Sequence, residues 1–249
     1  MRHLVGSNTF VAAACVMIAA LSHGGEARAA GAAYQVDTAE VSEVGSCKVE
    51  SWISAARNHD AFAAVAPACV VNLYRPVELS AQFARARSDG EWVNGIVPKF
   101  KTNLIPSAIG SWGVALTGTV AYDVTGREIA GYTVTVPATL RLSNVVRINV
   151  NAGWLLDRPN SRHYFTYGAG FDWRTPDNVW TLTGEVFGLL GSAEPDNRGQ
   201  VEPRFQLGIR WRPIDRFNID LIYGRNLYGE NANWLTVATI IRFPAKGEK

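Results

Sequence analysis

The chain has 249 residues, of which 47% are hydrophobic, 10% aromatic and 18% charged, and its formal net charge is +2. The length allows one large β domain or two ordinary domains. The near-neutral charge excludes a polybasic arm, so we expect no nucleic-acid partner. A mean hydropathy of -0.01 excludes a bundle of membrane helices. It does not exclude a membrane β-barrel, whose lipid and lumen faces average out.

The first 29 residues have the pattern of a secretory signal peptide. Arg2 and His3 precede an apolar run from Phe10 to Leu21, and Ala27-Arg-Ala29 supplies a small-x-small cleavage pattern. The run is too short for a spanning helix. We therefore expect cleavage after residue 29 and a periplasmic N-terminal segment over residues 30–45. The alternative is a buried N-terminal helix.

Two cysteines remain after export, Cys47 and Cys69. In an oxidising compartment they are expected to form one disulfide, which would stabilise the fold by about 3 kcal/mol in the chain-entropy model. The alternative is a pair of buried free thiols. Neither cysteine belongs to a C-x-x-C motif, so we expect no metal site, and nothing in the sequence implies a cofactor.

From about residue 45 onward, apolar residues recur at every second position. In the segment 93–104, Ile96, Phe100 and Leu104 fall on one face, and Lys99 and Lys101 on the other. Alternation over nine to twelve residues indicates β-strands, and no segment of the mature chain keeps a 3.6-residue period. Twelve strands are predicted, at residues 46–55, 67–74, 77–87, 91–104, 111–123, 131–142, 144–155, 163–174, 179–189, 201–212, 216–225 and 233–243.

These strands are long enough to cross a bilayer when tilted. Aromatic residues gather near the predicted strand ends, as in the interfacial girdles of membrane barrels. The fold class is therefore all-β, a transmembrane antiparallel β-barrel of about twelve strands over residues 46–243, with a tail over residues 244–249. Connections are expected to be mostly tight on the side of the termini, with residues 105–110 somewhat longer, and to be longer on the other side.

The lumen face of the predicted barrel carries an excess of cationic residues. By parity the inward cations are Lys48, Lys99, Lys101, Arg141, Arg147, Arg174, Arg204, Arg210 and Arg212, and the inward acids are Glu50, Glu78, Asp123, Asp172, Glu185 and Asp220. Rings of Lys and Arg favour anions in pores. The candidate pore-lining residues are Lys99, Lys101, Arg141, Arg147, Glu185, Arg204, Arg210 and Asp220. A lumen filled by salt-bridged side chains is an equal alternative, because twelve strands lie between filled and open barrels.

Several short motifs point to a family resemblance. They are Pro98-Lys-Phe-Lys-Thr-Asn103, Gly184-Glu-Val-Phe-Gly188, Tyr223-Gly-Arg-Asn226 and Gly229-Glu-Asn-Ala-Asn-Trp234. The chain resembles Gram-negative outer-membrane barrels of the transporter-like family associated with the meta-cleavage pathway of phenol degradation. The resemblance implies passage of small, often aromatic or hydrophobic, molecules. The final strand, ending at Phe243, is similar to the signal by which the barrel-insertion machinery recognises such proteins.

The function predicted from the sequence is a passive outer-membrane channel for small, anionic or aromatic, solutes, with the lipid bilayer and lipopolysaccharide as partners. Arg85 and Arg87 are candidates to pair with lipopolysaccharide phosphates. No catalytic residues are assigned and the chain is expected not to be an enzyme, since Ser161 and His163 lie in no recognisable nucleophile motif. The alternatives are a structural or adhesive barrel acting through loops such as Gly191–Gln200, or a lipid-modifying barrel enzyme.

Overall fold

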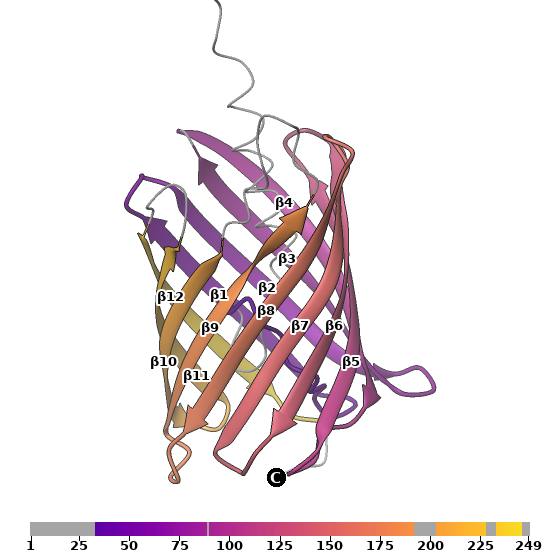
Figure 1. Cartoon of the computed structure of the whole chain (residues 1–249), viewed down its shortest axis with the longest axis vertical. Helices are drawn as coiled ribbons and strands as arrows, with labels where there is room; N and C mark the ends of the chain where they lie inside the picture. Colours follow the sequence, from indigo (N-terminus) through magenta and orange to yellow (C-terminus); the bar gives the residue numbers. More distant parts are fainter. Residues whose placement is uncertain (1–32, 89, 192–202, 228–232, 246–249) are drawn as a thin grey trace, which may run out of the picture.

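The computed structural model describes residues 33–88, 90–191, 203–227 and 233–245. The predicted signal peptide, most of the Gly191–Gln200 loop and the last four residues of the tail lie outside these ranges. Twelve strands form one closed antiparallel barrel, in which each strand pairs with its sequence neighbours and β1 pairs with β12 (Figure 1). The barrel prediction is therefore confirmed. No helix in the described part of the chain is long and apolar enough to cross a membrane.

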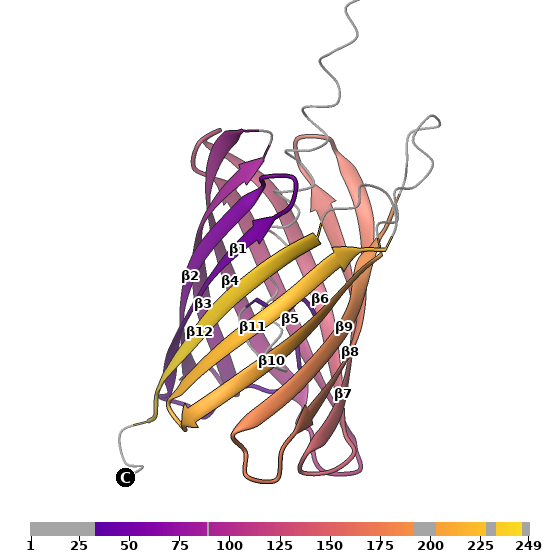
Figure 2. The same ribbon diagram turned by 90° about the vertical axis from the view of Figure 1, so that its left-hand side faces the viewer.

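The strands are tilted and follow chain order around the barrel, as two perpendicular views show (Figures 1 and 2). Closure of the ring by the first and last strands satisfies every sheet edge, which a bilayer requires. Their bounds are β1 Cys47–Ala56, β2 Ala61–Asn72, β3 Pro76–Ser88, β4 Glu91–Ile105, β5 Trp112–Asp123, β6 Glu128–Arg141, β7 Val146–Asp157, β8 Arg162–Arg174, β9 Trp180–Gly191, β10 Arg204–Ile214, β11 Phe217–Asn226 and β12 Asn233–Phe243.

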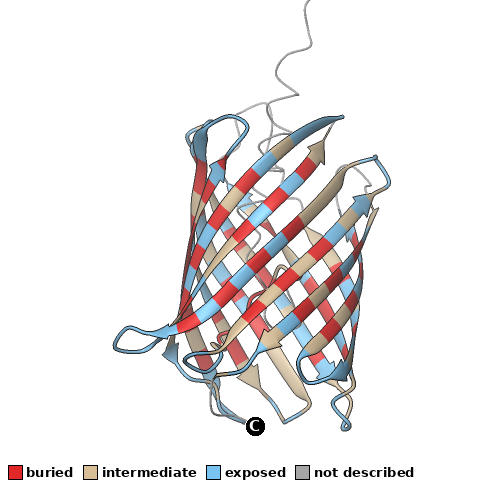
Figure 3. Cartoon of the chain, turned by 180° about the vertical axis from the view of Figure 1, so that it is seen from behind, coloured by how far each residue is buried: buried red, intermediate tan, exposed pale blue. Residues whose placement is uncertain are grey.

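Buried and exposed residues alternate along the strands, which gives the barrel a chequered surface (Figure 3). On β4 the buried positions are Val97, Lys99 and Lys101, whereas Phe100 and Leu104 are exposed. The outside is therefore apolar and the inside polar, which is the inverse of a soluble domain and the expected pattern for a barrel in lipid. The predicted faces of Lys99, Lys101, Phe100 and Leu104 are confirmed.

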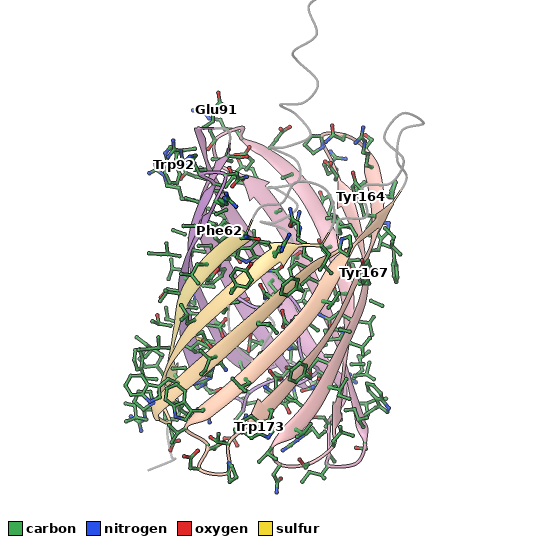
Figure 4. All side chains as sticks on the ribbon, turned by 60° about the vertical axis from the view of Figure 1, so that its left-hand side comes forward. Phe62, Glu91, Trp92, Tyr164, Tyr167 and Trp173 are labelled. Atoms are coloured by element: carbon green, nitrogen blue, oxygen red, sulfur yellow. A yellow bond between two sulfur atoms is a disulfide. The ribbon has the colours of Figure 1, made fainter. Side chains whose placement is uncertain are left out.

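Large aromatic side chains project from both ends of the outer surface. Trp92 and Trp173 lie toward opposite ends of the barrel (Figure 4), and Trp180 stacks on Trp211 with ring centroids 6.2 Å apart. Amphipathic rings at these levels match the two interfaces of a bilayer. They bound an apolar band between them.

The second strand differs from the prediction. Residues 67–74 were expected, but β2 begins six residues earlier, at Ala61. Its inward positions are small, namely Ala64, Ala66 and Ala68, so the segment shows little contrast between its faces. The turn over residues 57–60 sets Cys47 directly opposite Cys69, and these form the predicted disulfide.

The connections also differ from expectation. At the end where β12 finishes, called here the C-terminal end, β4 and β5 are joined by residues 106–111 and β10 and β11 by residues 215–216. At the opposite end, β5–β6 and β7–β8 are joined by only four residues each, 124–127 and 158–161. β6 begins three residues before its predicted start and β7 ends two residues beyond its predicted end, so these two connections are tighter than expected.

Candidate functional site

The predicted pore-lining residues lie on the lumen side of their strands. Lys99 and Lys101 are buried on β4, Glu185 on β9, Arg210 on β10 and Asp220 on β11. Arg141, Arg147 and Arg204 are half-buried at strand ends. Most of them contact carboxylates or polar groups, several of which belong to a part of the chain outside the barrel wall.

Residues 33–42, called here the lumen segment, precede β1 and run inside the ring of strands (Figures 1 and 2). The lumen segment falls within the predicted periplasmic N-terminal segment, residues 30–45. Tyr34, Val36, Thr38 and Ala39 are fully buried, and Asp37 is 2% exposed. The segment fills the lumen because its acidic and apolar side chains meet basic side chains and glycines on the wall.

Asp37 forms the central contact between the lumen segment and the wall. Its carboxylate oxygens lie 2.7 Å from Nζ of Lys101 and 2.8 Å from Nζ of Lys99. The side-chain amide of Asn151, oriented to satisfy its hydrogen bonds, donates to the Asp37 carbonyl oxygen at 2.8 Å and accepts from the Asp37 N–H at 2.6 Å. Burial alone would raise the pKa of Asp37, but the two ammonium groups more than offset it and hold that pKa below its ordinary value.

Glu40 forms a second acidic contact, nearer the C-terminal end. Its Oε2 lies 2.6 Å from Nη1 of Arg147, and its Oε1 is 4.0 Å from Nε of Arg141. Arg147 also donates through Nε to Asp172 at 2.7 Å. The Arg147 guanidinium therefore joins the lumen segment to the wall, because it lies between the carboxylates of Glu40 and Asp172.

The other end of the lumen segment reaches the opposite wall. The N–H groups of Gln35 and Val36 donate to the Glu185 carboxylate at 2.9 and 3.3 Å. Tyr34 lies against Gly208 of β10, where an added Cβ would fall 1.8 Å from the tyrosine oxygen. Burial raises the pKa of Tyr34. The segment is consequently held by contacts that differ in kind along its length.

A cavity of about 510 Å³ opens between the lumen segment and the turns of the C-terminal end. Seven cationic side chains and three carboxylates line it: Lys48, Arg141, Arg147, Arg174, Arg210, Arg212 and Arg242, with Glu40, Glu50 and Asp172. Arg210 forms a bidentate pair with Asp220, and Lys48 donates to Glu50. The surroundings of this cavity are strongly cationic.

Three of these guanidinium groups lack a carboxylate partner among the described residues. Arg174 and Arg242 form no ion pair there, and Arg212 donates only to the side-chain oxygen of Asn218, at 3.3 Å. Nε of Arg174 and Nη1 of Arg242 are buried atoms with no hydrogen-bond partner in the described chain. Buried donors of this kind favour an anion beside them.

Asp37, Glu40 and Tyr34 were not among the predicted site residues. Their one sequence signal is charge: Asp37 and Glu40 are acidic residues in a short mature segment, upstream of a barrel whose inward face is basic. Arg242 was also absent, although strand parity would have placed it inward, because it directly precedes the outward Phe243. The described residues contain no group of three or more His, Cys, Asp and Glu that could hold a metal ion.

The fold and the lumen define a class: a closed twelve-strand transmembrane β-barrel with a charged, partly filled interior. A family model described as "Uncharacterised conserved protein UCP029691" matches residues 17–243. The chain belongs to that family. The finer resemblance to the phenol-degradation family is not confirmed by this match, and no curated protein matches the chain.

Solved outer-membrane barrels share the fold. The KdgM porin in complex with disordered oligogalacturonate has a TM-score of 0.62 and 9% identity, over 79% of this chain and 99% of that one. The COG4313 outer membrane channel from Pseudomonas putida F1 has a TM-score of 0.58 and 13% identity, over 82% and 97%. The NanC porin has a TM-score of 0.61 and 6% identity, over 78% and 98%. At such identities the likeness extends to the fold alone.

Proposed function

We propose that the chain is an outer-membrane channel through which small anionic solutes pass passively. The observation that carries this proposal is the cationic cavity, because seven cations face three carboxylates around it. Fixed positive charge in a confined polar lumen concentrates anions and repels cations. The apolar outer band supports a place in a bilayer, and the shared fold with porins supports the outer membrane.

The signal peptide over residues 1–29 and recognition of the final strand by the barrel-insertion machinery belong to the same proposal. Lys99, Lys101, Arg141, Arg147, Glu185, Arg204, Arg210 and Asp220 are proposed to line the path. Passage of aromatic solutes rests only on the sequence resemblance to the phenol-degradation family. The cations of the cavity favour anionic solutes instead.

The measurement that tests the proposal is single-channel current in a planar bilayer under a KCl gradient. The reversal potential is expected to report anion preference. Replacement of Arg174, Arg212 and Arg242 by glutamine should reduce that preference severalfold, because no carboxylate among the described residues pairs with these guanidinium groups. As the matched control, Arg85→Gln and Arg87→Gln remove positive charge from the outward parity of β3 and should leave selectivity unchanged.

A second candidate is favoured by one observation, the burial of Tyr34 and of residues 36–39 within the lumen. A barrel filled in this way could serve as a scaffold for its loops. This candidate would be favoured over the channel if wild type and variants of the lumen segment conduct no current. Heat-modifiable gel mobility would show that each of these proteins is folded. A channel with cation preference would contradict the anionic assignment.

Contact with lipopolysaccharide is proposed for the outer rim. Arg85 is exposed, and its guanidinium lies 4.6 Å from the ring centroid of Trp92 (Figure 4 labels Trp92). A guanidinium held over an interfacial ring is well placed for a lipid phosphate. Arg85→Gln should weaken retention of lipopolysaccharide during purification, measured by phosphate content. Unchanged content would contradict the assignment.

A further inference from the structure

The lumen segment crosses the barrel between opposite walls. Asp37 contacts β4, and Tyr34 lies against Gly208 of β10. In the closed twelve-strand ring, β4 and β10 are separated by six strand steps in either direction. Because these contacts lie on facing walls, the segment stands in the path of any solute that passes through the lumen.

The lumen segment binds to the wall through carboxylate groups, which are also the charged groups of small organic acids. The Asp37 carboxylate takes one ammonium group on each oxygen, and the Glu40 carboxylate takes the Arg147 guanidinium. Glu40 also lines the cationic cavity. The cations of the cavity and those around Asp37 therefore follow one another along the lumen. At two places in this series the lumen segment already supplies a carboxylate, from Asp37 and from Glu40.

We propose that the lumen segment is a resident carboxylate ligand that narrows the path, and that solutes with two or more carboxylates widen the path by competing for its two binding positions. The first position is Lys99 with Lys101, and the second is Arg141 with Arg147. This inference rests on the proposed channel function and goes beyond it, since it names the solute class and the element that must move.

The spacing of the two positions limits the size of the solute. Asp37 and Glu40 are three residues apart, so their Cα atoms are separated by at most about 11 Å. One polycarboxylate of moderate length can reach both positions. At the first position each carboxylate oxygen accepts its own charge-assisted hydrogen bond, from Lys99 or Lys101. At the second, Arg147 donates to one oxygen and Arg141 lies 4.0 Å from the other. Two cations placed in this way select a carboxylate over a singly charged halide.

The way the segment is attached allows it to leave the lumen. Residues 33–42 belong to no strand, and each of their printed hydrogen bonds and ion pairs with the wall involves a side chain. Displacement breaks no pairing in the barrel. The chain turns from lumen to wall at Gly45, whose φ of +86° favours glycine. Directly beyond it, the Cys47–Cys69 disulfide fixes the start of β1.

An engineered disulfide tests the proposal. A Cβ added at Gly170 would lie 3.5 Å from the Cβ of Val36, within the range that disulfides adopt. In the oxidised Val36→Cys/Gly170→Cys protein the segment is fixed, and we expect conductance in citrate at least tenfold below that of the same protein after reduction. Wild type with and without reductant controls for cleavage of Cys47–Cys69, and heat-modifiable gel mobility confirms folding of each form.

Two outcomes separate the inference from the function on which it rests. If the oxidised double variant conducts as well as its reduced form, the segment is no gate, while the channel function stands. If wild type, the reduced double variant and Asp37→Asn/Glu40→Gln are all silent, the channel function fails and the inference fails with it.

A second measurement avoids conductance altogether. Disulfide formation in the reduced Val36→Cys/Gly170→Cys protein reports how often the segment occupies its place. Citrate should slow this reaction severalfold relative to KCl of equal ionic strength, because it competes with Asp37 and Glu40 for the same cations. Equal rates in the two salts would overturn the proposed competition even if the fixed segment blocks current.

Discussion

Gly208 is a position where the absence of a side chain decides how the lumen is filled. The Tyr34 ring lies so near that an added Cβ would fall 2.6 Å from its Cζ. Tyr34 is fully buried and has no room to retreat. Glycine therefore permits the close approach of the lumen segment to β10.

Gly208→Ala is expected to destabilise the barrel by about 1–3 kcal/mol, the usual cost of overpacking. The measurement is urea unfolding in lipid vesicles, followed by tryptophan fluorescence. In a Tyr34→Ala background the same substitution should cost much less, because the clashing ring is gone. A cost that is the same in both backgrounds would show that the strand, and not the tyrosine, requires glycine.

Among the residues of the lumen, Asp37 is expected to contribute most to the free energy of unfolding. Asp37→Asn removes the buried carboxylate that Lys99 and Lys101 contact, which should cost about 3–5 kcal/mol near pH 7 while the segment stays in place. The folded-state pKa of Asp37 lies below its ordinary value. Its stabilisation is therefore complete above the ordinary pKa of about 3.9 and is lost only as the pH falls through the lower folded-state value.

The free-energy difference between wild type and Asp37→Asn should thus stay constant from pH 7 to pH 5 and shrink below pH 3. Urea unfolding at each pH measures it. Asp215→Asn, an exposed residue of the β10–β11 turn, serves as the control and should show a small difference throughout. A difference that declines already between pH 6 and pH 5 would mean that the ammonium groups do not depress the pKa of Asp37.

At the scale of elements, strands with strong contrast between their faces were the ones predicted most closely. The strand of Lys99 and Phe100 was expected at 91–104 and found at 91–105. In β2 the inward face carries alanines, so burial leaves little trace in the sequence and the boundary was placed at Pro67. Pairing with β1 fixes the strand instead, and that information lies in residues far from β2 itself.

The lumen segment shows why the rest of the site could not be predicted. Strand parity assigns a residue to the lipid or to the lumen, and it placed Lys99, Lys101 and Arg210 correctly. Strand parity gives no information about a segment without strand structure. The partners of Asp37 are also distant in sequence, 62 and 64 residues away. The only sequence signal that relates the lumen segment to the wall is charge, because the segment is acidic and the inward face of the barrel is basic.

The Cys47–Cys69 disulfide should matter for the first hairpin of the barrel. It joins directly opposed residues of β1 and β2, 22 positions apart, where β1 also pairs with β12. Replacing both cysteines by serine is expected to cost about 3 kcal/mol in the chain-entropy model. Urea unfolding measures the loss, and reduction of the wild type should reproduce it. A reduced wild type as stable as the oxidised one would contradict this.

The whole molecule has an asymmetric distribution of charge. The cationic cavity opens at the C-terminal end, where the turns 106–107 and 143–145 border it, and the lumen segment separates it from the opposite end. A solute entering from the C-terminal end meets attractive charge before any obstruction. Entry from the other end reaches the segment first.

This asymmetry predicts rectification. Current should be larger at the polarity that drives anions in from the C-terminal end, because fixed charge raises their local concentration at that mouth. The effect should be clear at 0.1 M KCl and nearly absent at 1 M, where the Debye length falls from about 10 Å to about 3 Å. Current–voltage curves at the two concentrations measure it, whichever way the barrel inserts. Rectification that persists unchanged at 1 M would assign the asymmetry to the shape of the lumen, and Arg174, Arg212 and Arg242 would then have no part in it.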